Sequence, residues 1–307
     1  MTWLAWRQFR ANAMAATIAT VVVVVVLVVT RDHVAAAADP DTVSTVYKSL
    51  RLLGTALIGV PAFIGAFWGA PLLAHEFETG TFRLAWTQSV TRRRWLATRV
   101  GVVGLVAILI AGVFSLVFSW WSGPFDQVGN RIGTANFGQR GVVPIAYALF
   151  ALALGTLAGG VLRRTLPAIV ATLAGFFVVR FAFQLAVRPR LLSTVTATLP
   201  NNVFGQRDGN GATSGGWILS STTVDRAGHV LTNAQIDRIV RRSCDVTTRT
   251  TTADLGRCAD RIGLHDVVRM HPASQFWSLQ LLEAMSFVIL AAVLMIASFW
   301  WIRRHAA

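Results

Sequence analysis

The chain has 307 residues, of which 54% are hydrophobic and 14% charged, well below the roughly one quarter charged that is usual in soluble proteins. Residues 11–30, 52–74 and 100–123 carry no charge at all. Each window can cross about 30 Å of hydrocarbon as a helix that rises about 1.5 Å per residue. The composition therefore excludes a soluble protein and indicates an integral membrane protein.

Taken alone, the net charge of +14 is compatible with nucleic-acid binding. However, the arginines gather at the ends of the apolar runs, which is typical of the signals that orient membrane helices. No nucleic-acid partner is expected, and the lipid bilayer accounts for the basic residues.

Six membrane-spanning helices are predicted, at residues 12–29, 52–74, 96–121, 142–162, 166–187 and 276–302. Eleven basic residues lie on the side of the N- and C-terminal segments, against five in the opposite short loops. This bias places both ends in the cytoplasm. The expected fold class is an all-α polytopic membrane protein, N-in and C-in, with a small extracytoplasmic insertion between the fifth and sixth spans.

The N-terminal sequence MTWLAWRQFR alternates aromatic and basic residues, as does a short helix lying in the inner membrane interface. A cleaved signal peptide ending in the small residues 34–38 is the alternative. Because residues 30–33 include charged residues between the apolar run and that site, we expect the first span to be retained.

Three parts of the chain are distinguished. Residues 1–187 hold the interfacial helix and spans one to five, residues 188–275 form the polar insertion, and residues 276–307 hold the sixth span and a cytoplasmic tail. The insertion contains Cys244 and Cys258, the two cysteines of the chain, and outside the cell they would form a disulfide. A metal site is the alternative, but this spacing fits zinc poorly. Thr232 is expected to begin a helix there.

Signatures of catalysis are missing from the sequence. The single lysine, Lys48, follows Tyr47, so no Walker motif is present. His75 and Glu76 begin like a HExxH zinc motif, but Thr79 ends the match. We therefore expect no catalytic residue, no metal ligand and no bound cofactor in this chain.

Two ionisable residues stand within apolar runs, Arg180 in the fifth span and Glu283 in the sixth. A lone charge in lipid is costly, so these two are expected to pair with one another. The pair would either fix the packing of the helices or form a polar element near an outer gate. Alternatively, Arg180 would extend its side chain outward to the membrane surface. In the second span, Gly65 and Gly69 are spaced for close approach of another helix, within the chain or across a subunit interface.

Between the second and third spans lies a charged stretch that is too long for a tight turn. Glu76 and Glu78 open it, Gly80 is expected to end the preceding helix, and Thr81 can begin a short helix at residues 82–86. That short helix carries Phe82, Arg83 and Trp86. It would be a docking surface, or alternatively a loop whose arginines bind lipid phosphates.

The pattern Glu76-x-Glu78-x-Gly80-Thr81, followed by Thr91-Arg92, resembles the cytoplasmic loop of type 2 ABC exporter permeases. Val90 and Arg99 stand where proline and lysine are common in that family. The resemblance implies that residues 75–95 couple this chain to a separate P-loop ATPase, which would bind ATP and Mg. It also implies a multi-pass protein of the cell membrane that works as a homodimer, or paired with a similar permease, in substrate efflux.

The same resemblance implies that spans two and five line the transport path. The aromatic residues then expected along its wall are Phe63, Phe67, Phe177 and Phe181. Two other functions are compatible with the sequence. One is a membrane sensor or receptor whose insertion binds a ligand and whose cytoplasmic loop signals to a partner. The other is an intramembrane enzyme, which the scarcity of polar residues in the spans disfavours.

Overall fold

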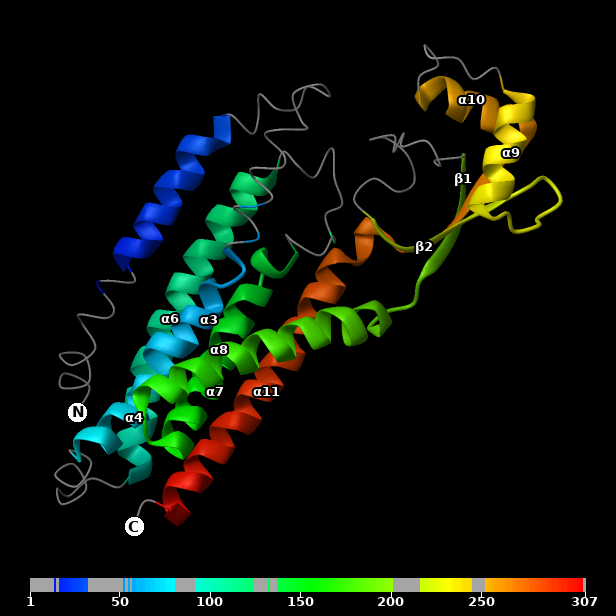
Figure 1. Cartoon of the computed structure of the whole chain (residues 1–307). Coiled ribbons are helices and arrows are strands. Elements are labelled where there is room, and N and C mark those ends of the chain that lie inside the picture. Colours follow the sequence, from blue (N-terminus) through cyan, green and yellow to red (C-terminus); the bar gives the residue numbers. More distant parts are fainter. Residues whose placement is uncertain are drawn as a thin grey trace. The chain divides into compact units, whose positions relative to one another are not determined.

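The computed structural model describes residues 14, 17–32, 52, 55, 57–80, 92–123, 132, 137–200, 216–244 and 252–305. The chain divides into two compact units (Figure 1). Unit 1 comprises Met1–Pro124, Thr134–Arg188 and Ser278–Ala307, and unit 2 comprises Phe125–Gly133 and Pro189–Trp277.

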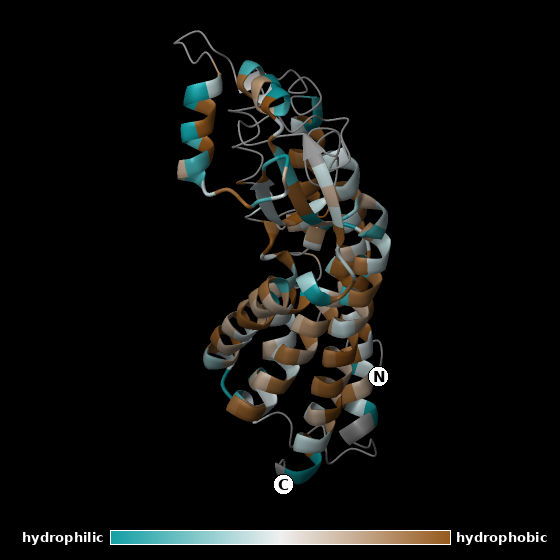
Figure 2. Cartoon of the chain, turned by 90° about the vertical axis from the view of Figure 1, so that its right-hand side faces the viewer, coloured by the Kyte–Doolittle hydropathy of each residue, from teal (hydrophilic) through white to brown (hydrophobic). Residues whose placement is uncertain are grey.

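Unit 1 is built from long helices along which hydrophobic residues dominate (Figure 2). Its helical segments are residues 17–32, α3 (Val60–Ile64), η1 (Gly65–Gly69), α4 (Ala70–Thr79), α6 (Arg92–Ser122), η3 (Phe137–Gln139), α7 (Val143–Leu162), α8 (Thr165–Ala182), η4 (Phe183–Val187), and α11 (Phe276–His305), which begins in unit 2.

Four described segments are long and apolar enough to cross a membrane: Arg94–Ser122, Val143–Leu162, Thr165–Arg190 and Ala273–Arg304. They coincide with the third to sixth predicted spans. Helices at 17–32 and 60–79 also cover most of the described residues of the first two predicted spans. The total of six spans and the N-in, C-in orientation remain predictions.

Two π-helical segments, η1 and η4, share a cause in the sequence. Each lies just before a proline, Pro71 or Pro189. A proline lacks an N–H, and its ring clashes with the carbonyl group four residues earlier. Those carbonyls belong to Phe67 and Leu185, at the centre of each π segment. The wider turn relieves the clash, and it inserts one residue into the helical register.

Glycines bring the second predicted span close to α7. A Cβ atom on Gly155 would lie 2.3 Å from the carbonyl oxygen of Gly65, and one on Gly159 would lie 2.3 Å from that of Ala70. Gly69 approaches the backbone of Leu152 in the same way. The predicted close approach is therefore confirmed. Its partner is a helix of the same chain, so these glycines do not form a subunit interface.

Unit 2 contains a three-stranded antiparallel sheet of order β1-β3-β2, formed by β1 (Val195–Pro200), β2 (Trp217–Val224) and β3 (His265–His271). The prediction of an all-α protein was therefore wrong for this part. Strand β3 buries Asp266, Val268 and Met270 on alternate positions. Because the first of these is a carboxylate, which binds Thr223 Oγ1 at 2.6 Å, the strand lacks a clear apolar alternation.

Two helices, α9 (Asn233–Ser243) and α10 (Thr252–Ile262), accompany the sheet in unit 2. A disulfide joins Cys244 to Cys258 with their Cα atoms 6.0 Å apart, as predicted. Around it, Ile236, Val240, Ala259 and Leu264 form a small buried cluster. Helix α9 begins after Thr232, as expected, and the side chain of Gln235 accepts a hydrogen bond from the Thr232 backbone N–H at 2.8 Å.

Candidate functional site

The glutamates of the charged stretch lie on a helix rather than in a loop. Helix α4 continues through Glu76 and Glu78 to Thr79, and Gly80 ends it with a φ of +70°. Only glycine adopts that conformation at little cost, so the predicted helix end is confirmed. The remaining predicted coupling residues, Thr81, Phe82, Arg83 and Trp86, lie outside the described residues.

Glu76 connects α4 to α6. Its Oε1 atom lies 2.7 Å from Nη1 of Arg99, and both side chains are largely shielded, with 13% and 15% of their surface exposed. The Arg99 guanidinium also stacks over the Trp95 ring, 4.5 Å from its centroid. Partial burial and a second contact make this ion pair stronger than an ordinary surface pair.

Glu78 connects α4 to α8. Its carboxylate accepts hydrogen bonds from the backbone N–H of Thr165 at 3.1 Å and from Thr165 Oγ1 at 2.5 Å. Thr165 is the first residue of α8, where unpaired N–H groups and the helix dipole favour a negative charge. The hydrogen bonds from the Thr165 side chain and backbone lower the pKa of the Glu78 carboxyl. The end of α4 is thus attached to two other helices.

A second polar cluster is buried in unit 1 around Glu283 of α11. Nε and Nη2 of Arg188 lie 2.7 Å from Oε2 and Oε1 of Glu283, and neither side chain is exposed. The Tyr147 hydroxyl of α7 donates a hydrogen bond to Oε1 of the same carboxylate. Glu283 therefore pairs with Arg188. The predicted ion pair between Glu283 and Arg180 was wrong.

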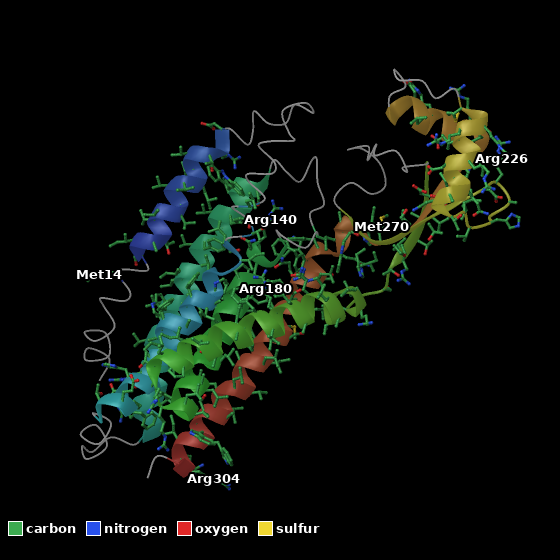
Figure 3. All side chains as sticks on the ribbon, in the orientation of Figure 1. Met14, Arg140, Arg180, Arg226, Met270 and Arg304 are labelled. Carbon is green, nitrogen blue, oxygen red and sulfur yellow. A yellow bond between two sulfur atoms is a disulfide. The ribbon has the colours of Figure 1, made fainter. Side chains whose placement is uncertain are left out.

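Arg180 lies in the same cluster but binds other groups. Its Nη1 atom donates to the carbonyl oxygen of Ile58 at 2.9 Å, and its guanidinium lies over the Tyr147 ring, 4.8 Å from the centroid. Figure 3 shows Arg180 among the helices of unit 1. Only 1% of its surface is exposed.

The π-helical segment η4 explains why Arg188 was missed. In an α-helix, residues eight apart point about 80° away from one another at about 100° per residue. The extra residue in η4 makes Arg180 and Arg188 equivalent to residues seven apart, within about 20° of the same face. The sequence pattern places Arg188 at the start of the polar insertion, and Pro189 was the one signal that the last helical turn before it is distorted.

Gln280, one turn from Glu283 on α11, has a structural part in the cluster. Its side chain is buried, donates to the carbonyl oxygen of Phe137 at 2.9 Å and accepts from the backbone N–H of Val143 at 3.3 Å. Gln280 therefore satisfies one backbone group in η3 and one at the start of α7, the helix that carries Tyr147.

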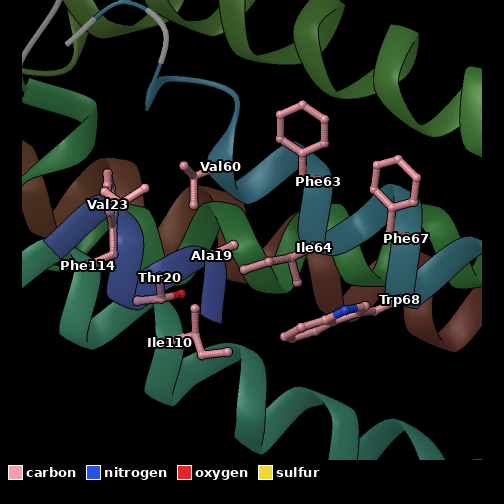
Figure 4. A pocket seen from close by; sticks show the side chains of 10 residues that line it. All are labelled: Ala19, Thr20, Val23, Val60, Phe63, Ile64, Phe67, Trp68, Ile110 and Phe114. Carbon is pink, nitrogen blue, oxygen red and sulfur yellow. The ribbon is translucent and has the colours of Figure 1, made fainter. Parts of the chain in front are cut away.

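The four predicted wall aromatics form two stacked pairs. The ring centroids of Phe63 and Phe67 are 5.8 Å apart, and those of Phe177 and Phe181 are 6.0 Å apart. A cavity of about 430 Å³ is lined by nine apolar residues and Thr20, which come from helix 17–32, the second predicted span and α6 (Figure 4). Phe63 and Phe67 line this cavity, whereas Phe177 and Phe181 lie outside its lining.

Within the described part of the chain, no group of three or more His, Cys, Asp or Glu side chains is arranged to hold a metal ion. The contacts described in the two polar regions are ion pairs and hydrogen bonds between helices.

Comparison with known proteins gives one family. A family model described as ABC-2 membrane transporter related matches residues 18–188, more than half of the chain. No curated protein and no solved structure matches the chain. The matched region contains both helix-linking glutamates as well as Arg180 and Arg188. The chain therefore belongs to the ABC-2 membrane transporter related family, as its resemblance to type 2 ABC permeases implied.

Proposed function

We propose that this chain is the membrane-spanning subunit of an ATP-driven exporter in the cell membrane, and that residues 75–95 couple it to a separate P-loop ATPase. The observation that carries the proposal is the attachment of the α4 end to α6 and α8 through Glu76 and Glu78, in a chain of the ABC-2 family. A force applied at the end of α4 would therefore act on α4, α6 and α8 together.

The coupling follows from differential binding. ATP and Mg bound by the ATPase pair would favour one arrangement of the segment after Gly80. That arrangement can shift the equilibrium between two states of the permease only if it interacts more favourably with one state than with the other. Because Glu76 binds Arg99 and Glu78 binds Thr165, the segment cannot move far without displacing α6 and α8 or breaking those contacts.

Three exposed aromatic residues, Phe63, Phe67 and Phe181, support a homodimeric working unit of two such chains with two ATPases. About half of the surface of Phe63 and Phe67 is exposed, at 54% and 50%, and Phe181 is 45% exposed. Aromatic residues at such positions are suited to line a path between two copies or to contact the second copy. The disulfide of unit 2 agrees with an extracytoplasmic location.

The proposal is tested by purifying the full chain from its native membranes in mild detergent and identifying the proteins that accompany it. We expect a stoichiometric P-loop ATPase, and ATP hydrolysis that responds to the permease. Recovery of the intact chain without any ATPase, in several detergents and in nanodiscs, would overturn the proposal and favour the sensor alternative.

Charge-neutral variants separate docking from transmission. Glu76→Gln and Glu78→Gln keep the side-chain shape but weaken the contacts to Arg99 and Thr165. We expect the ATPase to bind normally but to lose its response to the permease. Asp254→Asn, on α10 of unit 2, removes a comparable charge and is the matched control. Unchanged coupling in both glutamate variants would contradict the transmission role.

A further inference from the structure

The buried cluster around Glu283 carries more positive than negative charge. As described, it contains the guanidinium groups of Arg180 and Arg188 and the carboxylate of Glu283, with exposed fractions of 1%, 0% and 0%. Arginine stays protonated in proteins, and the Tyr147 hydroxyl adds no negative charge. Within the described part of the chain, one positive charge is therefore left without a partner of opposite sign, in an environment where such a charge is costly.

The unused donors of Arg180 lie on one edge of its guanidinium. Among the described residues, its Nε and Nη2 atoms are buried and have no hydrogen-bond partner, while Nη1 binds the Ile58 carbonyl. Arg188 uses the same two atoms, Nε and Nη2, to hold both oxygens of Glu283. Arg180 thus presents the edge that binds a carboxylate or phosphate in a two-point contact.

A glycine lies beside this edge. A Cβ atom on Gly138 would be 2.7 Å from Nη2 of Arg180 and 3.2 Å from the Tyr147 ring. Gly138 has no positive φ that would demand a glycine for the backbone alone. With glycine at position 138, no side chain crowds Nη2 of Arg180. Nη1 of Arg188 is a further buried donor without a partner within the described structure.

We propose that Arg180 forms the centre of an oxyanion-binding site inside unit 1, which takes one carboxylate or phosphate group on its Nε and Nη2 atoms. The bound anion balances the excess charge of the cluster and satisfies the unpaired donors. It is either a free anion or the headgroup of an anionic lipid. The assignment concerns binding to this chain alone and does not depend on the ATPase partner or on transport.

The first experiment measures thermal unfolding of the purified full chain in zwitterionic lipid nanodiscs, with inorganic phosphate or acetate added at constant ionic strength. If the site takes free anions, one of these anions raises the unfolding temperature in a saturable way. We then expect Arg180→Gln to weaken this binding about tenfold or more, since it removes a charge-assisted two-point contact.

Two further variants separate a specific site from general charge effects. Gly138→Ala leaves every charge in place but puts a methyl group against Nη2, and it should weaken binding by a similar factor. Arg303→Gln removes an exposed positive charge from the end of α11, the helix of Glu283, and should leave the affinity unchanged. If Arg180→Gln fails to fold, Gly138→Ala still decides the question.

The second experiment tests a lipid source. The chain is reconstituted with phosphatidylglycerol or with phosphatidylcholine, and native mass spectrometry counts the lipids that stay bound. If the anion is a headgroup, phosphatidylglycerol is retained by the wild type and by Arg303→Gln, and lost from Arg180→Gln and Gly138→Ala. The proposal is overturned when neither free anions nor anionic lipid show binding that depends on Arg180 and Gly138.

Discussion

Unit 1 and unit 2 are each stabilised internally by a different kind of contact. Unit 1 relies on backbone contact at glycines and on a buried ion pair, whereas unit 2 relies on a disulfide, a small apolar cluster and a sheet. Between helices in lipid the hydrophobic effect is weak, so close packing and polar contacts specify the arrangement. A small polar unit has too little core to be stable by burial alone, so a covalent link adds what the core lacks.

The largest effect is expected at the ion pair of unit 1. Glu283→Ala leaves Arg188 buried without its partner and adds a second uncompensated positive charge to the cluster. Breaking a buried pair in this way costs about 3–5 kcal/mol of folding free energy. Thermal or denaturant unfolding of the purified chain in detergent measures the loss.

The double variant Arg188→Met/Glu283→Met sharpens this test, because it removes both charges together. Replacing a whole buried pair with apolar side chains is often nearly neutral. We therefore expect the double variant to be more stable than Glu283→Ala. A double variant as unstable as the single one would mean that the pair acts through geometry rather than through charge.

A slightly smaller effect is expected at the disulfide of unit 2. Replacing Cys244 and Cys258 by serine opens a loop of about 15 residues, which costs about 3 kcal/mol in the chain-entropy model. Hydrogen exchange should show lost protection in α9 and α10 and unchanged protection in α7. Loss of protection in both units would contradict the separation of their stabilising contacts.

How far the sequence predicted this molecule depends on the kind of signal. The apolar runs predicted the spans from α6 to α11 to within a few residues. Their length and lack of charge follow directly from the thickness and low polarity of the lipid core. The disulfide between Cys244 and Cys258 and the helix end at Gly80 were also predicted correctly from the sequence. The sheet was not, because β1 pairs with β3 across some 70 residues and Asp266 breaks the apolar pattern.

The site illustrates the same limit at the scale of single residues. The sequence identified Arg180 and Glu283 as buried charges but not their partners. Pairing depends on a π-turn before Pro189 that brings Arg188 onto the face of Arg180. Likewise, the sequence indicated that Glu76 and Glu78 were special but not that each binds another helix, since Arg99 and Thr165 are distant along the chain.

A third test addresses the glycine packing of unit 1. Gly155→Ala would place its Cβ atom 2.3 Å from the Gly65 carbonyl oxygen, so the helices must separate. Overpacking of this kind costs about 1–3 kcal/mol. Gly101→Ala in α6 is the control, because its Cβ atom would meet nothing within 4 Å and alanine favours a helix. Equal unfolding temperatures in the two variants would rule out close packing as the stabilising feature.

The smallest effect is expected at Glu78, where the contact is exposed. The hydrogen bonds from Thr165 lower the pKa of the carboxyl below its ordinary value of 4.5, so the folded state favours the ionised form. The contribution to stability is then fully present above that value and disappears as the pH falls through the lowered pKa. We expect Glu78→Gln to lower the unfolding temperature at neutral pH, with a difference from wild type that shrinks in acid. Thr165→Val removes only the hydroxyl donor and should give part of the same loss. A difference that persists in acid would mean that Glu78 acts through its shape, and α4 and α8 would then be joined by packing rather than by charge.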